Sequence, residues 1–345
     1  YGVTVETPNG FFSLRFPANQ DIRAAEQWYR MNKAQNFEEW KEALEMQGII
    51  CTNIVYADKE DHIYYVSNGR FPKRNPNYDW TGVVPGNTSE TLWTEYYPLD
   101  SLAQVLNPSS GYVYNCNHTP FLSSGKSDNP DVSQIPSTIG YEHPSFVTNR
   151  AVRLYHLLEN DKSIDYEEFK TIKFDRTYHK PLHSAPKLEP IFSLDENKYP
   201  QIATSIQLLK AWDRVASDDS EGASIFILSL YDVLKKLKKR ESLAIGDELT
   251  EAMLVASVES TQAYLQEIFG KVKVPLSELQ RHSRGDVDLP YGGGPDVLAA
   301  VGSRPRKDGL LQPYAGDSYI ELVRYSEHGV EIESINAFGA SAKPG

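Results

Sequence analysis

Cysteine is scarce in this chain, since its 345 residues include only Cys51 and Cys116. Two cysteines cannot build a disulfide framework or a structural zinc site. A single bridge between them stays open, but the sequence favours two buried free thiols. The Gly-x-Ser-x-Gly motif of the α/β-hydrolase nucleophile is also absent. We therefore expect no cofactor. We also expect that no single local motif supplies a nucleophile, a base and an orienting residue together.

Basic residues and long apolar runs are also few. The 35 Lys and Arg residues are outnumbered by 47 Asp and Glu, which gives a net charge of −12. Nucleic-acid binding needs a basic face, so nucleic acid is not an expected partner. The one basic cluster, residues 235–240, ends a predicted helix, where cations complement the helix dipole. No apolar run approaches the roughly 18 to 20 residues that cross a bilayer, so no membrane span is expected.

The first 70 residues contain clear helix and strand signals. Asp21 is predicted to cap one helix, and Asn36 with Glu39 forms a capping-box pattern before a second. Residues 49–57 and 62–68 are predicted to be the strands of a hairpin, and the apolar character of the first predicts that it is buried.

Loops and then helices follow. Residues 72–144 are rich in Pro, Gly, Asn, Ser and Tyr, and they are predicted to form long ordered loops around a short strand at 111–114. Apolar stripes with helical spacing dominate from about 148 to 270. Residues 318–336 alternate apolar and polar side chains around Gly329, which predicts a closing hairpin.

This order of elements predicts an α+β protein whose sheet is completed by distant segments. We expect a core segment with long loops at 1–147, a helical segment at 148–275, and a returning loop with C-terminal strands at 276–345. The three segments belong to one fold and are not independent domains.

Two polar residues in the hairpin region are candidates for a functional site. Asn53 interrupts an apolar strand, so its amide either bonds to neighbouring backbone or donates into a cleft, where it can stabilise an oxyanion. Arg74 is either solvated or a fixed charge that orients a neighbouring group. The tripeptide Arg284-Gly285-Asp286 is too short to indicate adhesion, and the glycines at 292–294 lack the context of a phosphate-binding loop.

The same region resembles the penicillin acylase family of N-terminal-nucleophile amidohydrolases. The similarity runs through Asn53-Ile-Val-Tyr-Ala-Asp58, Gly69-Arg-Phe-Pro-Lys-Arg74, Trp80-Thr-Gly82 and Asn107-Pro-Ser-Ser-Gly-Tyr-Val-Tyr-Asn115-Cys-Asn117. It continues, in the family's order, through Leu209-Lys-Ala-Trp212-Asp213, Gly222-Ala223, Arg284-Gly-Asp-Val-Asp-Leu-Pro290 and Gly316-Asp-Ser-Tyr319. The last two variants look closest to the branch that acts on acyl-homoserine lactones and long-chain amides.

The resemblance implies part of a four-layer αββα fold and assigns roles to single residues. Asn53 matches the asparagine whose side-chain amide helps to form the oxyanion hole, and Arg74 matches an arginine that organises the active site. Asn115 and Asn117 match a supporting loop. Asp317 or Glu321 could match an acidic partner found late in some relatives. The resemblance also leaves calcium open, with no assignable ligands, and implies a periplasmic or secreted protein.

In this family the nucleophile is a serine that autocleavage exposes at the N-terminus of the β-chain, upstream of the Asn53 position. The chain is therefore expected to be a β-chain fragment, truncated at both ends and inactive alone. Its expected partners are an N-acyl small-molecule substrate, the α-subunit and the N-terminal part of the β-chain. The expected activity is hydrolysis of an N-acyl bond such as that of acyl-homoserine lactones or penicillins. The alternatives are a non-catalytic binding protein on the same scaffold and a secreted glycan-binding domain.

Overall fold

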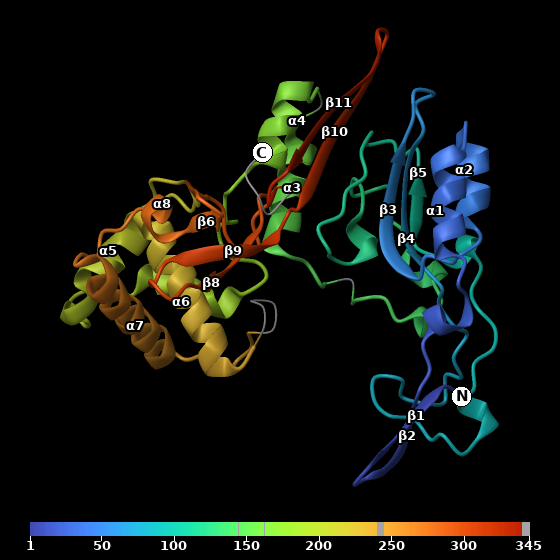
Figure 1. Cartoon of the computed structure of the whole chain (residues 1–345), viewed down its shortest axis with the longest axis horizontal. Helices are drawn as coiled ribbons and strands as arrows, with labels where there is room; N and C mark the ends of the chain where they lie inside the picture. The colour runs from blue at the N-terminus through green and yellow to red at the C-terminus, as the bar shows by residue number, and fades with distance from the viewer. Residues whose placement is uncertain (144, 162, 240–244, 340–345) are drawn as a thin grey trace. The chain divides into compact units, whose positions relative to one another are not determined.

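The chain divides into two compact units, Tyr1–Phe146 and Val147–Gly345 (Figure 1). The computed structural model describes residues 1–143, 145–161, 163–239 and 245–339. Each unit combines helices with antiparallel strands. The predicted α+β class is therefore confirmed, and the two predicted segments at 148–275 and 276–345 lie within the second unit.

A three-stranded antiparallel sheet forms the centre of the first unit. Its strands are β3 (Cys51–Ala57), β4 (Ile63–Gly69) and β5 (Gln104–Leu106), in the order β3-β4-β5. Helices α1 (Ala24–Lys33) and α2 (Phe37–Leu44) cover one face of this sheet (Figure 1). The core between them contains side chains from both layers: Met31, Phe37, Trp40, Leu44, Ile54, Tyr64 and Val66.

The predicted hairpin at 49–57 and 62–68 is confirmed as β3 and β4, but the burial predicted for β3 is wrong. Ile54 is the one β3 side chain that is buried, because β3 lies at the edge of the sheet and only one of its faces is covered. The strand predicted at 111–114 is also wrong. Gly111 has a φ of +79°, which breaks the extended backbone, and Val113 makes a single bridge to Ser124.

The helix caps of this unit follow the sequence only in part. Asn36 caps α2 by accepting a hydrogen bond from the Glu39 backbone N–H at 2.9 Å, as predicted. The cap predicted at Asp21 is wrong, because α1 begins after Arg23. The Asp21 carboxylate instead forms ion pairs with Arg23 at 2.6 Å and with Arg70, at the end of β4, at 2.5 Å. Asp21 therefore ties the segment before α1 to the central sheet.

This ion pair predicts a pH-dependent contribution to the stability of the first unit. Hydrogen bonds from Arg23 hold the pKa of Asp21 well below its ordinary value, and the side chain is only 6% exposed. A carboxylate with a lowered pKa stabilises the fold above its unfolded pKa, and this contribution disappears as the pH falls through the folded pKa. We expect Asp21→Asn to lower the free energy of unfolding by about 1 to 2 kcal/mol at pH 7.

The measurement is urea denaturation of the wild-type chain and the variant from pH 7 to pH 2.5. The difference between them should shrink below about pH 4, the unfolded pKa of an aspartate. Asp100→Asn is the matched control, because Asp100 pairs with Lys41 at 3.4 Å but is 77% exposed. An equal loss in both variants, or a difference that does not change with pH, would refute the role of Asp21.

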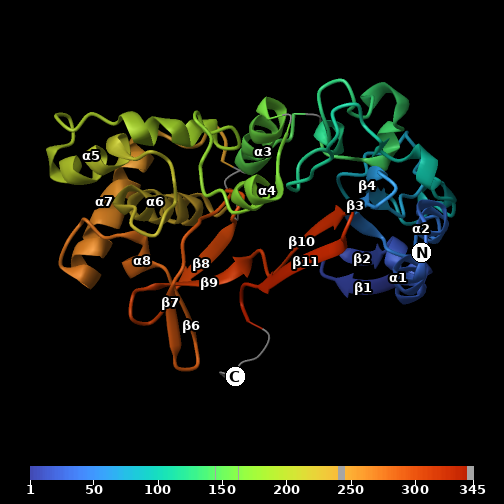
Figure 2. The same cartoon turned by 90° about the horizontal axis from the view of Figure 1, so that it is seen from above.

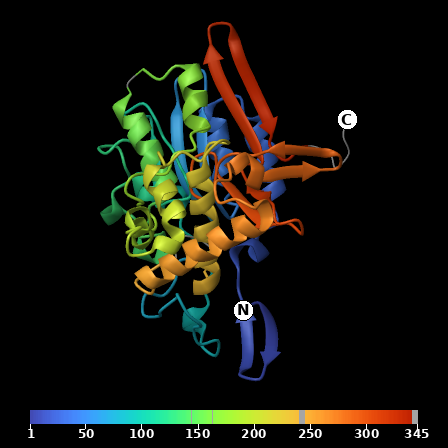
Figure 3. The same cartoon turned by 90° about the vertical axis from the view of Figure 1, so that its left-hand side faces the viewer.

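The remainder of the first unit is a hairpin and a series of loops. Strands β1 (Val3–Thr7) and β2 (Gly10–Leu14) form a hairpin that extends away from the three-stranded sheet (Figures 1 and 3). One short 3-10 turn, η1 (Pro17–Gln20), lies near the N-terminus. The described part of the predicted loop region contains five more: η2 (Ser89–Thr91), η3 (Leu99–Ser101), η4 (Pro120–Leu122), η5 (Val132–Gln134) and η6 (Ser137–Ile139).

Helices dominate the second unit, as the apolar spacing predicts. They are α3 (Asn149–Asn160), α4 (Tyr166–Lys173), η7 (Pro186–Ser193), η8 (Pro200–Ile202), α5 (Ala203–Ala211), α6 (Glu221–Leu237), α7 (Glu251–Phe269) and α8 (Leu276–Leu279). The predicted stripe of α6 is buried against α5 and α7. Lys235 and Lys236 lie in the last turn of α6, as predicted, whereas Arg240 lies outside the described residues.

Two of the sequence landmarks meet in this helical core. The Trp212 ring, after α5, packs 5.4 Å from the ring of Phe226 on α6, measured between centroids. Gly222 lies directly against it, so that a methyl group at Gly222 would be 2.6 Å from Trp212 Cβ. The glycine is needed there because no larger residue fits between α6 and the indole.

Three antiparallel hairpins complete the second unit. They pair β6 (Arg281–Arg284) with β7 (Val287–Pro290), β8 (Val301–Pro305) with β9 (Leu311–Gly316), and β10 (Tyr319–Ser326) with β11 (Gly329–Asn336). The closing hairpin and its turn at Gly329 are as predicted. Figure 2 shows β8 and β9 beside α6, and β6–β7 extending away from the helices of this unit.

Candidate functional site

An open pocket of about 770 Å³ lies on the face of the central sheet that α1 and α2 leave uncovered. Strands β3 and β4 form its floor, and two loops form its walls. Its lining residues are Cys51, Thr52, Asn53, Val55, Ser67, Asn68, Phe71, Asn115, Asn117, His118, Gly140, Tyr141 and Glu142. The pocket therefore brings Asn53 together with the predicted supporting residues Asn115 and Asn117. These two lie more than 60 residues after Asn53 in the sequence.

The Asn53 amide is held in one orientation by a buried tyrosine. Tyr65, on β4, is fully buried, and its hydroxyl donates a hydrogen bond to Asn53 Oδ1 at 2.9 Å. Burial raises the pKa of Tyr65, so the hydroxyl stays protonated and remains a donor. Because Tyr65 engages the amide oxygen, the NH2 group is the part of this pocket-lining side chain that is left to donate, and it has no acceptor within the described residues.

The loop at 115–118 holds a second amide, that of Asn115, at the wall of the same pocket. Asn115 Oδ1 accepts a hydrogen bond from the Asn117 backbone N–H at 2.8 Å, while Asn115 Nδ2 is buried without a partner in the described part of the chain. His118 accepts from the Cys116 N–H through Nδ1 and contacts the Leu122 carbonyl through Nε2. Both ring nitrogens of His118 thus support the loop, so this histidine is not a candidate base.

Arg74 lies next to the pocket and does not line it. A methyl group on Gly140, a lining residue, would be 3.7 Å from Arg74 Nη1. The guanidinium is 5.7 Å from the Trp80 ring centroid, and its Nε is buried without a partner among the described residues. Burial lowers the pKa of Arg74, yet an arginine remains protonated in proteins. It is therefore a half-buried positive charge behind the Gly140 wall.

The cysteines differ from the expectation of two buried thiols. Both are free, and Cys116 is buried, but Cys51 is exposed because it lies on the edge strand β3 at the pocket. Neither Cys51 nor the two lining hydroxyls, Thr52 and Ser67, is hydrogen-bonded to a histidine within the described residues. This pocket therefore supplies hydrogen-bond donors and a nearby cation, without a paired nucleophile and base.

The two late acids, Asp317 and Glu321, belong to the second unit. Asp317 forms an ion pair with Lys173 at 2.5 Å, and Glu321 is exposed on β10. The described residues contain no group of three or more His, Cys, Asp or Glu side chains that could hold a metal ion. They also contain no helix that is long and apolar enough to cross a membrane.

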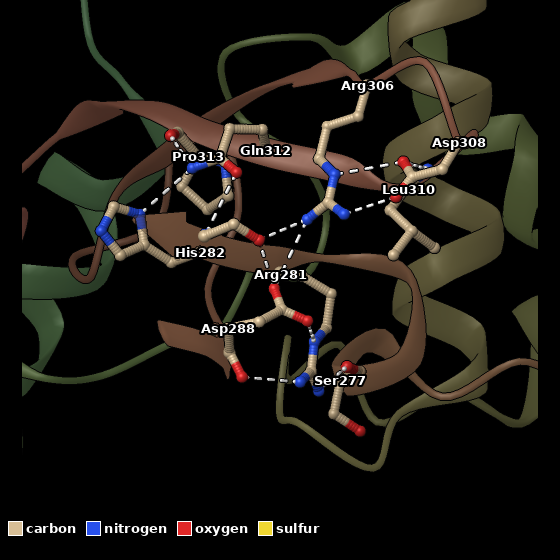
Figure 4. Close-up of polar contacts among 10 residues, drawn as sticks. Ser277, Arg281, His282, Asp288, Arg306, Asp308, Leu310, Gln312 and Pro313 are labelled. Carbon is tan, nitrogen blue, oxygen red and sulfur yellow. Dashed lines mark hydrogen bonds and ion pairs between the residues drawn. The ribbon is translucent and has the colours of Figure 1, made fainter. Parts of the chain in front are cut away.

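The late landmark at 284–290 forms the turn and second strand of the β6–β7 hairpin, and polar contacts hold this hairpin in place (Figure 4). Asp288 lies between two arginines, with Arg281 Nε at 3.1 Å and Arg306 Nη1 at 3.4 Å from its carboxylate. Arg284 donates to the Gly339 carbonyl at 2.8 Å. The motif is therefore used within the fold, and its arginine is not free for an adhesion partner.

Tyr65 is the residue of this site that the sequence reasoning missed. In the observed register Asn53 pairs with Ser67 and Val55 pairs with Tyr65, which places Tyr65 diagonally across from Asn53 on the same face. The alternation of the predicted hairpin could have indicated this neighbour. Gly140 and Tyr141 had no such signal, because a loop brings them to the sheet.

Solved structures show which class of protein this fold defines. The chain matches a thermostable penicillin G acylase from Alcaligenes faecalis with a TM-score of 0.56 and 16% sequence identity, over 99% of this chain and 70% of that one. The fold is therefore that of the penicillin acylases, which are N-terminal-nucleophile hydrolases. The family model for penicillin amidase matches residues 1–345, and the chain belongs to this family.

Curated relatives agree with this assignment. The chain is 22% identical to the acyl-homoserine lactone acylase PvdQ of Pseudomonas fluorescens strain Pf0-1, over 96% of this chain and 47% of that protein. It is 33% identical to penicillin G acylase of Escherichia coli over 33% of this chain and 13% of that protein. The chain spans about half the length of the PvdQ relatives that it matches.

Proposed function

We propose that the protein to which this chain belongs hydrolyses the amide bond of N-acyl small molecules. The observation that carries the proposal is the Asn53 side chain, which lines an open pocket and whose amide oxygen is held by Tyr65, so that its NH2 group is left to donate. A fixed amide donor of this kind can stabilise the negative charge that develops on a carbonyl oxygen during acyl transfer.

In the proposed reaction an N-terminal serine of the β-chain attacks the acyl carbonyl. Its hydroxyl proton passes to its own α-amine, and the carbonyl oxygen becomes an oxyanion that accepts a hydrogen bond from Asn53 Nδ2. Collapse of this intermediate breaks the C–N bond, and the amine leaves with the proton. Water then hydrolyses the acyl-serine ester to release the carboxylic acid and restore the hydroxyl.

Arg74 has a supporting role in this proposal. It lies behind Gly140 as a positive charge without a carboxylate partner in the described residues, so its field favours negative charge at the nearby pocket. Asn115 lines the same wall, and its side-chain oxygen is held by the Asn117 backbone N–H. Family resemblance supports export to the periplasm or beyond the cell.

The test is expression of the complete reading frame, mass spectrometry of the mature subunits, and an assay for free amine. We expect a subunit that begins with serine upstream of Tyr1, and release of homoserine lactone or 6-aminopenicillanic acid from an acylated substrate. An unprocessed chain that releases no amine would exclude catalysis. It would favour the alternative, a binding protein on the same scaffold.

A further inference from the structure

A second pocket, of about 680 Å³, lies entirely within the second unit. Helices α6 and α7 form one side, and the hairpin β8–β9, which lies beside α6 in Figure 2, forms the other. This volume is within the range of about 300 to 1,000 Å³ that is typical of small-molecule sites. None of its lining residues belongs to the Asn53 pocket, so its chemistry is independent of the proposed hydrolysis.

Aromatic and aliphatic side chains make the body of this pocket. Tyr231 and Leu228 come from α6, Tyr264 from α7 and Tyr314 from β9. The Tyr231 hydroxyl accepts a hydrogen bond from the Ser303 N–H at 2.9 Å. The Tyr264 hydroxyl donates to the Gly309 carbonyl at 2.5 Å. Because the hydroxyls of Tyr231 and Tyr264 are anchored to the backbone, their rings are fixed and offer apolar faces to a ligand.

Two cations complete the lining. Lys235 lies one helical turn after Tyr231, and Arg304, on β8, has its guanidinium carbon 5.5 Å from the Tyr314 ring centroid. Neither cation has a carboxylate within ion-pair distance among the residues that the structure describes, since the one lining acid, Asp232, is paired with Lys236 at 2.6 Å. The chain as a whole carries a net charge of −12. Although the chain is acidic overall, this pocket is therefore lined by two cations that have no carboxylate partner among the described residues.

We propose that this pocket binds an amphipathic monocarboxylate, that is, a small organic acid with an aryl or short acyl body. The apolar body would lie between the tyrosine rings, where burial removes its surface from water. The carboxylate would lie at Lys235 and Arg304, where a planar guanidinium can donate two parallel hydrogen bonds to its oxygens. An amine of the same shape would meet these two cations, and Asp232, the one acid among the described lining residues, is already paired with Lys236.

The test is isothermal titration of the purified chain with 4-phenylbutyrate, with 4-phenylbutanol and 4-phenylbutylamine as neutral and cationic analogues. We expect the acid to bind most tightly and the amine to bind most weakly. The double variant Lys235→Gln/Arg304→Gln should weaken the acid about tenfold or more and change the alcohol less than about twofold. Lys307→Gln/Lys239→Gln is the matched control, because it removes the same charge from outside the pocket and should leave acid binding within about twofold of wild type.

A second variant tests the pocket itself. Ser260, on α7, lines it, and Ser260→Trp should fill the space and weaken the acid and the alcohol together. Asn53→Ala, in the other unit, should change neither affinity. Equal binding of acid and alcohol, an equal loss in the control double variant, or unchanged binding in Ser260→Trp with a wild-type melting temperature would each overturn the proposal.

Discussion

Under the proposed hydrolysis, replacing Asn53 with alanine in the full-length protein is expected to lower kcat by about 10² to 10³-fold, the usual effect of removing one oxyanion donor. The substitution removes the NH2 group of a pocket-lining side chain and leaves β3 paired with β4 through the backbone. Because the hydroxyl of the buried Tyr65 loses its acceptor in this variant, the melting temperature should fall by a few degrees while the fold is kept. KM should also change little, since the lost hydrogen bond forms with the transition state.

Two further variants separate this role from a general effect on the fold. Asn77→Ala removes an exposed amide from a loop outside the pocket and should keep wild-type kcat. Tyr65→Phe keeps the buried ring but deletes the hydroxyl that holds Asn53 Oδ1, so Asn53 loses its fixed orientation. We expect Tyr65→Phe to lower kcat about tenfold, corresponding to about 1.4 kcal/mol. Wild-type kcat in Asn53→Ala, measured under saturating substrate, would rule out the oxyanion role.

Replacing Asp296 with alanine is expected to destabilise the second unit by about 2 to 4 kcal/mol. The Asp296 carboxylate accepts hydrogen bonds from the Asn149 N–H at 3.1 Å and from Ser184 Oγ at 2.6 Å. Asn149 is the first residue of helix α3, and both Asn149 and Ser184 are buried. Burial raises the pKa of Asp296, because water solvates its charge poorly there. Without this carboxylate, two buried donors would lose their acceptor.

The measurement is urea denaturation of the full chain, followed by fluorescence, with two comparison variants. Asp296→Asn keeps one carbonyl oxygen as an acceptor and tolerates the φ of +60° at this position, so it should cost less than alanine. Asp286→Ala removes an exposed carboxylate at the β6–β7 turn and should cost less than about 0.5 kcal/mol. If Asp296→Ala and Asp286→Ala unfold at the same urea concentration, the Asp296 network does not stabilise α3.

Local signals in the sequence were enough to place most elements of the fold. The α6 stripe, the Asn36 cap and the closing hairpin around Gly329 depend on periodicity and turn chemistry within a few residues, and all three are observed. The errors concern features that depend on distant neighbours. Asp21 pairs with Arg70, 49 residues away, in place of capping α1. Which side chains of β3 are exposed likewise depends on what packs on each face of the sheet, and the β3 sequence does not contain that information.

The candidate site shows the same division. Asn53 was a candidate because its polar amide interrupts an apolar strand, and the family motif indicated both Asn53 and Arg74. Their roles remain predictions, and the positions of Asn53 at the pocket and of Arg74 beside it agree with these roles. Tyr65 was missed because a tyrosine in a strand ordinarily indicates packing, and only the register of β3 on β4 places its hydroxyl at Asn53. The Gly140 wall was missed because it comes from a loop that no periodic pattern positions.

The two tyrosines beneath the pocket also bear on how the protein would respond to alkali. Tyr65 supports Asn53, and Tyr141 donates to the Ser67 carbonyl at 2.7 Å from the pocket wall. Burial raises the pKa of both hydroxyls above that of a free tyrosine. An exposed tyrosine ionises near pH 10, whereas these two keep their protons beyond that point. The amide donor should therefore keep its support in alkaline solution, and an alkaline loss of activity should be traced to other groups.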